Sequence, residues 1–279
     1  MGWARRINDG DYYGDGVGVW SRATGNKFMG TAAYDGEGND SFDIDNMTGF
    51  YSSALSGDIG YSFKRAKGFF DVVTYDGTGG ERSQTHNLGV VPELIIVKCR
   101  SHSTNSNWMV YNATIGNAKY LKLNDTGAAT AGSYWASTTP TTTGFTISAD
   151  DLVNGSSRTY VAYLFATLEG ISKVGTYSGT AYGGSDVDVN CGFSGGARFV
   201  LIKRTDDGSG GGVGSWYMWD TVRGIVSGND PYNTLNGTDA DQTTDDYIDP
   251  LTGGFRINAS AAPAAINALN STFIYLAIA

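Results

Sequence analysis

The chain has 279 residues, of which 41% are hydrophobic, 13% aromatic and 17% charged, and its formal net charge at pH 7 is −9. This length and hydrophobic content support two to three domains with buried cores and exclude a disordered chain. The acidic balance argues against a nucleic-acid partner, and the apolar runs are far shorter than the roughly 20 residues that cross a bilayer, so we expect no membrane insertion.

The first 67 residues are predicted to form a partial β module that lacks its opening strands. Residues 49–51 and 60–63 resemble residues 144–146 and 162–165, which close the following module. An incomplete sandwich exposes an edge or half of a core, and natural proteins cover such surfaces. The segment is therefore expected to pack on the second module or to be completed by another subunit, and we favour the subunit.

Short runs rich in Val, Ile, Tyr, Phe, Trp and Thr follow and predict β-strands separated by turn residues. In the first hundred residues of this region they are residues 69–75, 93–99, 108–111, 145–147 and 159–165. Residues 160–165 are apolar on both faces, which predicts a central strand covered by an opposing sheet and by loops or a neighbour. Helical periodicity is weak everywhere, and Pro263 interrupts the one alanine-rich stretch.

Residues 171–279 repeat the pattern of residues 68–170. The matched segments are 72–78 with 174–180, 94–98 with 199–203, 107–111 with 215–219, 144–147 with 254–257, and 161–164 with 273–276. A repeat of roughly a hundred residues is a whole domain rather than a solenoid unit. The short junctions near Lys67 and Glu169 predict a fairly stiff rod of modules.

The predicted fold class is therefore all-β, with tandem β-sandwich modules of jelly-roll or Ig-like type. Two full repeats, residues 68–170 and 171–279, are preceded by the half module of residues 1–67.

Catalytic chemistry finds little support in the residues. His86 and His102 are the two histidines, and neither recurs in the second repeat, where His86 aligns near Val189. A surface or turn-capping role for His86 is favoured over catalysis, and no GxSxG motif is present. Cys99 and Cys191 lie at different places in the two repeats, which favours free thiols over a disulfide or a zinc site. We therefore expect a protein that is not an enzyme.

One acidic segment is a candidate cation site. Its carboxylates could supply oxygen ligands to calcium, although their spacing does not match an EF-hand loop. A solvated acidic loop is the favoured interpretation, calcium is the alternative, and no other cofactor is expected. The candidate ligands are Asp239, Asp241, Asp245 and Asp246.

The aromatic residues fall into two groups. Trp108 and Trp216 recur at matched places, and a residue kept in both copies is typical of a core anchor. Trp135, Tyr182 and Tyr232 lie in or beside loops and are candidate ligand-binding residues. Because exposed aromatic faces stack on sugar rings, we expect a surface glycan as their ligand.

Residues 69–79 and 86–98 resemble a recurrent module of marine bacteriophage tail-fibre and virion structural proteins. Residues 199–204 and 216–220, with two Asp-Pro segments at 229–232 and 247–251, continue the likeness, which covers residues 60–279. In the proteins that it resembles, the module often forms the C-terminal part of longer fibres, sometimes behind a lectin-like domain. Only the half module precedes it here, so the binding role of such a domain is not carried over. The family has no agreed catalytic residues.

The resemblance implies a virion structural protein on the outside of a phage particle. The expected role is a non-enzymatic tail-fibre or baseplate-associated component for host-surface attachment. Its expected partners are further copies of itself, with a trimer favoured, other virion proteins, and a host-surface glycan or protein. The alternatives are a capsid-attached head fibre or decoration protein and a polysaccharide depolymerase.

Overall fold

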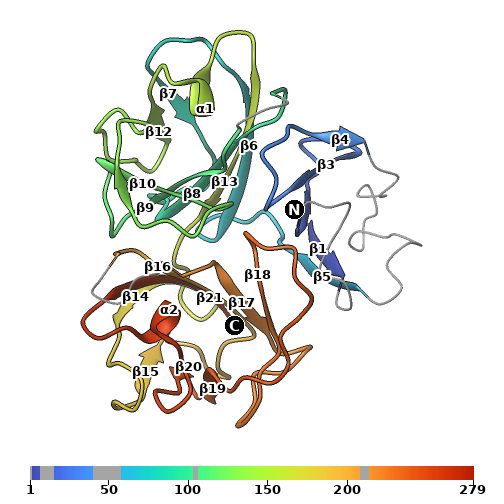
Figure 1. Ribbon diagram of the computed structural model, residues 1–279. Coiled ribbons are helices and arrows are strands. Elements are labelled where there is room, and N and C mark those ends of the chain that lie inside the picture. The colour runs from blue at the N-terminus through green and yellow to red at the C-terminus, as the bar shows by residue number, and fades with distance from the viewer. Residues whose placement is uncertain (1, 7–15, 40–57, 103–105, 208–213) are drawn as a thin grey trace.

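The computed structural model describes residues 2–6, 16–39, 58–102, 106–207 and 214–279 (Figure 1). These residues form β-strands joined by turns, and every pairing between named strands is antiparallel. Two four-residue helices, α1 (Asp151–Asn154) and α2 (Ala264–Asn267), interrupt the strands, and Pro263 is the N-cap of α2. The prediction of an all-β fold is confirmed.

The first group of strands is a five-stranded sheet that we call the N-terminal sheet. Its strand order is β4-β3-β2-β1-β5. The strands are β1 (Gly2–Arg6), β2 (Gly18–Trp20), β3 (Lys27–Gly30), β4 (Gly38–Asn39) and β5 (Asp58–Ser62).

The second group, which we call the first lobe, has a six-stranded sheet in the order β11-β10-β9-β8-β13-β6 and a separate pair, β12-β7. The large sheet contains β6 (Phe70–Asp76), β8 (Leu94–Cys99), β9 (Met109–Asn112), β10 (Lys119–Lys122), β11 (Thr130–Ala131) and β13 (Thr159–Phe165). The pair is β7 (Arg82–Thr85) with β12 (Gly144–Ile147).

The third group, the second lobe, has a five-stranded sheet in the order β14-β21-β16-β17-β18 and a small sheet in the order β15-β20-β19. The large sheet contains β14 (Ser172–Ser178), β16 (Phe199–Arg204), β17 (Tyr217–Asp220), β18 (Tyr232–Thr234) and β21 (Thr272–Ile278). The small sheet contains β15 (Val187–Asn190), β19 (Ile248–Leu251) and β20 (Gly254–Ile257).

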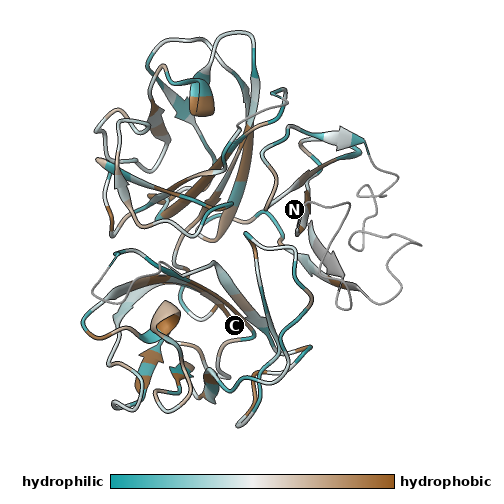
Figure 2. Cartoon of the chain, in the orientation of Figure 1, coloured by the Kyte–Doolittle hydropathy of each residue, from teal (hydrophilic) through white to brown (hydrophobic). Residues whose placement is uncertain are grey.

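Side chains from all three large sheets meet in one shared hydrophobic core. Phe63, directly after β5, lies 5.8 Å from both Phe165 of the first lobe and Phe199 of the second, measured between ring centroids. Burial of each such side chain contributes roughly 1.5–3 kcal/mol. Figure 2 shows the hydrophobic colouring gathered on the strands of the large sheets that line this centre. The lobes therefore lie side by side around one core, and the expected rod of modules is wrong.

Each lobe also has a hydrophobic core of its own on the opposite face of its large sheet. In the first lobe, Phe145 and Ile147 of β12 join this core with Val153 of α1. Strand β13 is buried from Tyr160 to Phe165 because it contributes to both cores, with Tyr163 in the shared core and Tyr160 in the core of the lobe. The two-sided burial expected for residues 160–165 is confirmed.

The described part of the N-terminal segment packs within the chain, and its completion by another subunit, which we favoured, stays a prediction. Trp3 lies 6.2 Å from Phe199 between ring centroids, and the Trp108 indole donates a hydrogen bond to the Gly30 carbonyl at 2.9 Å. The segment thus contacts both lobes. Residues 49–51, used for the sequence comparison, lie outside the described residues.

Strand pairing corrects one of the matched segments by a residue. Lys98 faces Val161 across the first lobe, and Lys203 faces Ile274 across the second. Val161 therefore corresponds to Ile274, not to Phe273. Because successive side chains of a strand point to opposite faces, the proposed match placed every residue of β21 on the wrong face.

The seams that we predicted coincide with tight turns. Gly68 and Gly170 have φ angles of 78° and 72°, inside turns closed by the bridges Ala66–Phe70 and Leu168–Ser172. These backbone angles favour glycine. The division into residues 1–67, 68–170 and 171–279 remains a prediction. None of the helices among the described residues is long and apolar enough to span a membrane.

Candidate functional site

Two of the three candidate glycan-binding aromatics are buried. Trp135 is 1% exposed, and its indole donates a hydrogen bond to the Lys119 carbonyl at 3.1 Å. Tyr232 is 8% exposed and packs with Trp219, with ring centroids 5.6 Å apart. Neither residue offers an open ring face to a sugar. Tyr182 is 74% exposed and is the candidate that fits a surface contact.

Trp108 and Trp216 are core residues, as predicted. Both are buried in the shared core. The indole of Trp108 donates to the carbonyl of Gly30 and that of Trp216 to the carbonyl of Lys122, each at 2.9 Å. Both tryptophans therefore bind the backbone of the preceding part of the chain.

The four candidate calcium ligands do not come together. Asp241 Oδ2 lies 2.9 Å from an Nη1 of Arg223, so this carboxylate already has a cationic partner. Asp245 accepts a hydrogen bond from the Tyr232 hydroxyl at 3.2 Å, while Asp246 accepts one from an asparagine amide. Asp239 precedes them on the same segment. Within the described residues, no group of three or more His, Cys, Asp or Glu side chains is placed to hold a metal ion.

His86 caps a turn, and both cysteines are buried. The Nδ1 atom of His86 accepts a hydrogen bond from the Leu88 amide at 3.2 Å, which confirms the turn-capping interpretation. Its side chain is 7% exposed, so the histidine is not a surface residue. Cys99 and Cys191 are free, as predicted, and burial raises the pKa of the Cys191 thiol to about 11. A thiol with this pKa is a poor nucleophile at neutral pH.

An ionic cluster joins the N-terminal sheet to the second lobe. The hydroxyl of Tyr61 donates to Asp220 Oδ2 at 2.8 Å, and Arg223 donates to the same carboxylate at 2.6 Å. Arg223 also binds Asp241, which accepts a further hydrogen bond from Asn233 at 3.0 Å. Burial opposes the charge on Arg223, but Tyr61, Asp220 and Asp241 outweigh it and raise the pKa of the guanidinium. These charges hold two parts of the fold together.

Two buried lysines also hold parts of the fold together, and no role was predicted for them from the sequence. Lys98 Nζ donates to the carbonyl of Ala33 at 3.4 Å, and Lys203 Nζ donates to the carbonyl of Thr126 at 3.0 Å. Both side chains are fully buried. Burial lowers the pKa of Lys203 to about 7. The available signal was a lysine at the same place in two otherwise apolar strands.

Asp230 is another buried residue whose role was not predicted from the sequence. It is fully buried, and its Oδ1 atom accepts a hydrogen bond from the Val226 amide at 2.8 Å. Burial raises the pKa of this carboxyl to about 7. Its position beside Pro231 in a loop gave no sign of burial in the sequence.

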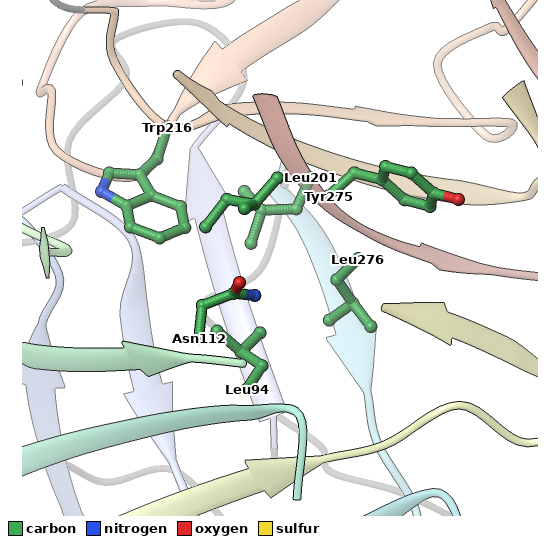
Figure 3. Close-up of a pocket in the computed structure, with 7 residues that line it drawn as sticks. Leu94, Asn112, Leu201, Trp216, Tyr275 and Leu276 are labelled. Carbon is green, nitrogen blue, oxygen red and sulfur yellow. The ribbon is translucent and has the colours of Figure 1, made fainter. Parts of the chain in front are cut away.

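A cavity between the lobes is too small for a substrate. Figure 3 shows Leu94 and Asn112 of the first lobe facing Leu201, Trp216 and Leu276 of the second across it. Its volume is about 10 Å³, which is room for about one water molecule. The space is a packing defect in the shared core rather than a binding pocket.

The tip of the second lobe is a further candidate site. Here Tyr182 is 74% exposed and Leu269 is 64% exposed. Backbone hydrogen bonds bring their segments together, because the Asn270 amide donates to the Gly179 carbonyl at 3.0 Å. Ala181 has a φ angle of 76°, in the left-handed region that favours glycine.

These features define an all-β protein in which the buried polar side chains described above bind other parts of the same chain. The chain belongs to the family described as domain of unknown function DUF7483, which it matches over residues 46–279. No curated protein and no solved structure matches the chain. Strand β5 lies within the matched range, and β1 to β4 lie before it.

Proposed function

We propose that this protein is a non-enzymatic structural component of a phage virion, built from tandem β-sandwich modules. The modules are residues 68–170 and 171–279, preceded by a partial module. The observation that carries this proposal is the shared plan of the two lobes. Strands β6, β8, β9 and β13 have the same order and pairing as β14, β16, β17 and β21. Such repetition suits a structural building block that presents the same module twice.

The chemistry of the buried polar groups also supports a structural role. Lys98 and Lys203 bind backbone carbonyls, and Arg223 binds two carboxylates. An enzyme needs a base or nucleophile directed at a substrate. These side chains are instead occupied by contacts that hold the sheets together.

We further propose a tail-fibre or baseplate-associated location on the virion exterior, with host-surface attachment as the role. The support is the resemblance of residues 60–279 to modules of phage tail-fibre proteins. Assembly as a homo-oligomer, with a trimer favoured, and contact with other virion proteins complete the proposal. Several copies would multiply weak contacts with a host glycan or protein through effective concentration.

Competition for adsorption tests the attachment role. Purified protein is added to host cells before the phage that encodes it, and free phage is then counted. The proposal predicts that saturating protein slows adsorption, whereas an equal amount of heat-unfolded protein does not. Unchanged adsorption at saturation would remove the attachment role.

The same lobe plan also suits a capsid-attached head fibre or decoration protein, because a repeated β module can be part of either the tail or the capsid. Antibody labelling of intact particles separates these locations. Release of reducing ends from host polysaccharide by purified protein would overturn the non-enzymatic role in favour of a depolymerase.

A further inference from the structure

The tips of the two lobes have the same backbone plan. In the first lobe, the Thr78 amide donates to Asn154 Oδ1 at 3.0 Å, and the Gly79 amide donates to the Asn154 carbonyl at 2.8 Å. In the second lobe, the amides of Thr180 and Ala181 make the same two bonds to Asn267, both at 2.9 Å. The tip residues can therefore be compared position by position.

This comparison shows that two small or polar residues have become large and apolar. Tyr182 stands where the first lobe has Gly80, and Leu269 stands where it has Ser156. Both side chains are largely exposed, so neither change fills the core. A Cβ atom on Gly80 would meet nothing within 4 Å, which agrees with an open position. The second lobe alone presents an apolar tip.

The backbone under Tyr182 is firmly held. The Gly183 amide donates to the Ala259 carbonyl at 2.7 Å, and the Gly184 amide donates to the Ala181 carbonyl at 3.0 Å. The Thr180 hydroxyl donates to the Ser185 carbonyl at 2.6 Å. A side chain displayed on a fixed backbone loses little further freedom on binding.

The backbone at this tip is also strained. Ala181 has a φ angle of 76° where the first lobe has Gly79 at 70°. An alanine in this conformation is disfavoured relative to glycine. The plan that both tips share imposes this angle, and the second lobe adopts it with alanine in place of glycine.

Size and charge indicate the class of ligand. Two side chains form a patch much smaller than the roughly 800 Å² per partner of a stable protein interface. The net charge of −9 disfavours an anionic ligand. Asp186 and Asp188, which follow Tyr182 closely in the chain, both pair with Arg256, so this cation has acidic partners already. An exposed tyrosine ring suits the apolar face of a sugar.

We propose that Tyr182 and Leu269 at the tip of the second lobe form a binding site for a neutral saccharide, an inference that rests on the proposed attachment function. The ring of Tyr182 provides the stacking face, and Leu269, whose backbone pairs with Gly179, adds apolar surface at the same tip. Affinity for one sugar is expected to be on the order of millimolar, and multiple copies raise it.

Ligand-observed NMR with the full chain tests this site. The probes are the methyl glycosides of glucose, galactose, mannose and N-acetylglucosamine, with N-acetylneuraminic acid as the anionic comparison. We expect saturation transfer to at least one neutral probe and none to the anionic one. Tyr182→Ala should weaken binding about tenfold or more, and Leu269→Ala less. Tyr182→Phe should retain binding, since it keeps the ring.

Tyr34→Ala is the matched control, because Tyr34 is 51% exposed on a different part of the chain. Binding by Tyr182→Ala equal to that of the unaltered protein, or no transfer to any neutral probe, would overturn the proposed site. The adsorption competition assay distinguishes failure of the saccharide site from failure of the attachment role. If unaltered protein and Tyr182→Ala compete equally well, the attachment role stands and the saccharide site does not. Binding of a neutral probe without competition supports the site and removes the attachment role.

Discussion

Lys203 shows how burial of one charged group changes the response of the fold to pH. Its pKa is lowered to about 7 in the folded chain, below the 10.5 of an ordinary lysine, because burial disfavours the charged form. Between these values the unfolded chain binds more protons than the folded chain. The contribution of this group to stability therefore rises as pH increases from about 7 toward 10.5.

We predict that Lys203→Met removes this rise. From about pH 7 to about pH 9 the free energy of unfolding of the unaltered protein should gain about 2 kcal/mol relative to the variant. Urea unfolding at both pH values measures the difference. Lys119→Met, at an exposed strand position, is the control and should follow the unaltered protein. An equal pH response in Lys203→Met and the unaltered protein would contradict the assignment.

Ala181 permits a second prediction at a single residue. Its left-handed backbone costs about 1–2 kcal/mol, which glycine avoids while losing some chain entropy on folding. Ala181→Gly should therefore stabilise the chain by up to about 1 kcal/mol, measured by the midpoint of urea unfolding. Gly79→Ala is the reciprocal control and should destabilise, because its Cβ would lie 3.2 Å from that of Ser156. A loss of stability in Ala181→Gly is the contradictory result.

Among the strands, sequence patterns located β8, β13, β16 and β21 but did not fix the register of β21. That strand is apolar on both faces, so a shift of one residue leaves its pattern almost unchanged. The pairing of Lys203 with Ile274 decides the register. The stacked pairs agree, since Tyr75–Tyr160 and Tyr177–Phe273 have centroids 5.2 and 4.9 Å apart.

The short helices α1 and α2 hold the tips of the lobes through one asparagine each. Asn267 accepts from the Thr180 amide at 2.9 Å and donates to the Ala181 carbonyl at 3.0 Å. Asn154 accepts from the Thr78 amide at 3.0 Å and donates to the Gly80 carbonyl. Both asparagines are fully buried. The role of these two asparagines was not predicted, because the residues around Asn154 differ from those around Asn267.

We predict that Asn154→Ala and Asn267→Ala destabilise the chain by similar amounts. Each leaves a backbone amide and a carbonyl without their side-chain partner, at a cost of about 2–4 kcal/mol in total. Chemical denaturation of both variants measures this cost. Asn117→Ala removes an exposed hydrogen bond to Thr139 and should change stability by less than about 0.5 kcal/mol. A large cost in one lobe and none in the other would refute the common role.

Strands, turns and core anchors could be predicted from the sequence, whereas the surroundings of the candidate site residues could not. Strands and turns follow from nearby residues, and the recurrence of Trp108 and Trp216 identified core anchors. The burial of Trp135 and Tyr232 could not be predicted, because it depends on residues that folding brings over them, such as Tyr111 over Trp135. The buried lysines escaped notice for the same reason, since their carbonyl partners lie in distant loops.

At the scale of the molecule, the apolar strands explain why the lobes do not form a rod. In each lobe the large sheet has one face against the core of that lobe and the other against the shared core. The N-terminal sheet gives this core a third side, through Trp3 and Phe63. Repeated contacts hold the sides together, with Trp108 bound to Gly30 and Trp216 bound to Lys122.

The central claim is the proposed role in a phage virion, and electron cryomicroscopy of purified particles of the phage that this proposal implies tests it most directly. The proposal predicts density on the particle exterior, in several copies, into which the three sheets and their shared core fit as one body. Mass spectrometry of the same particles should detect the chain. Particles that contain neither the chain nor such density would contradict a role as a virion structural protein.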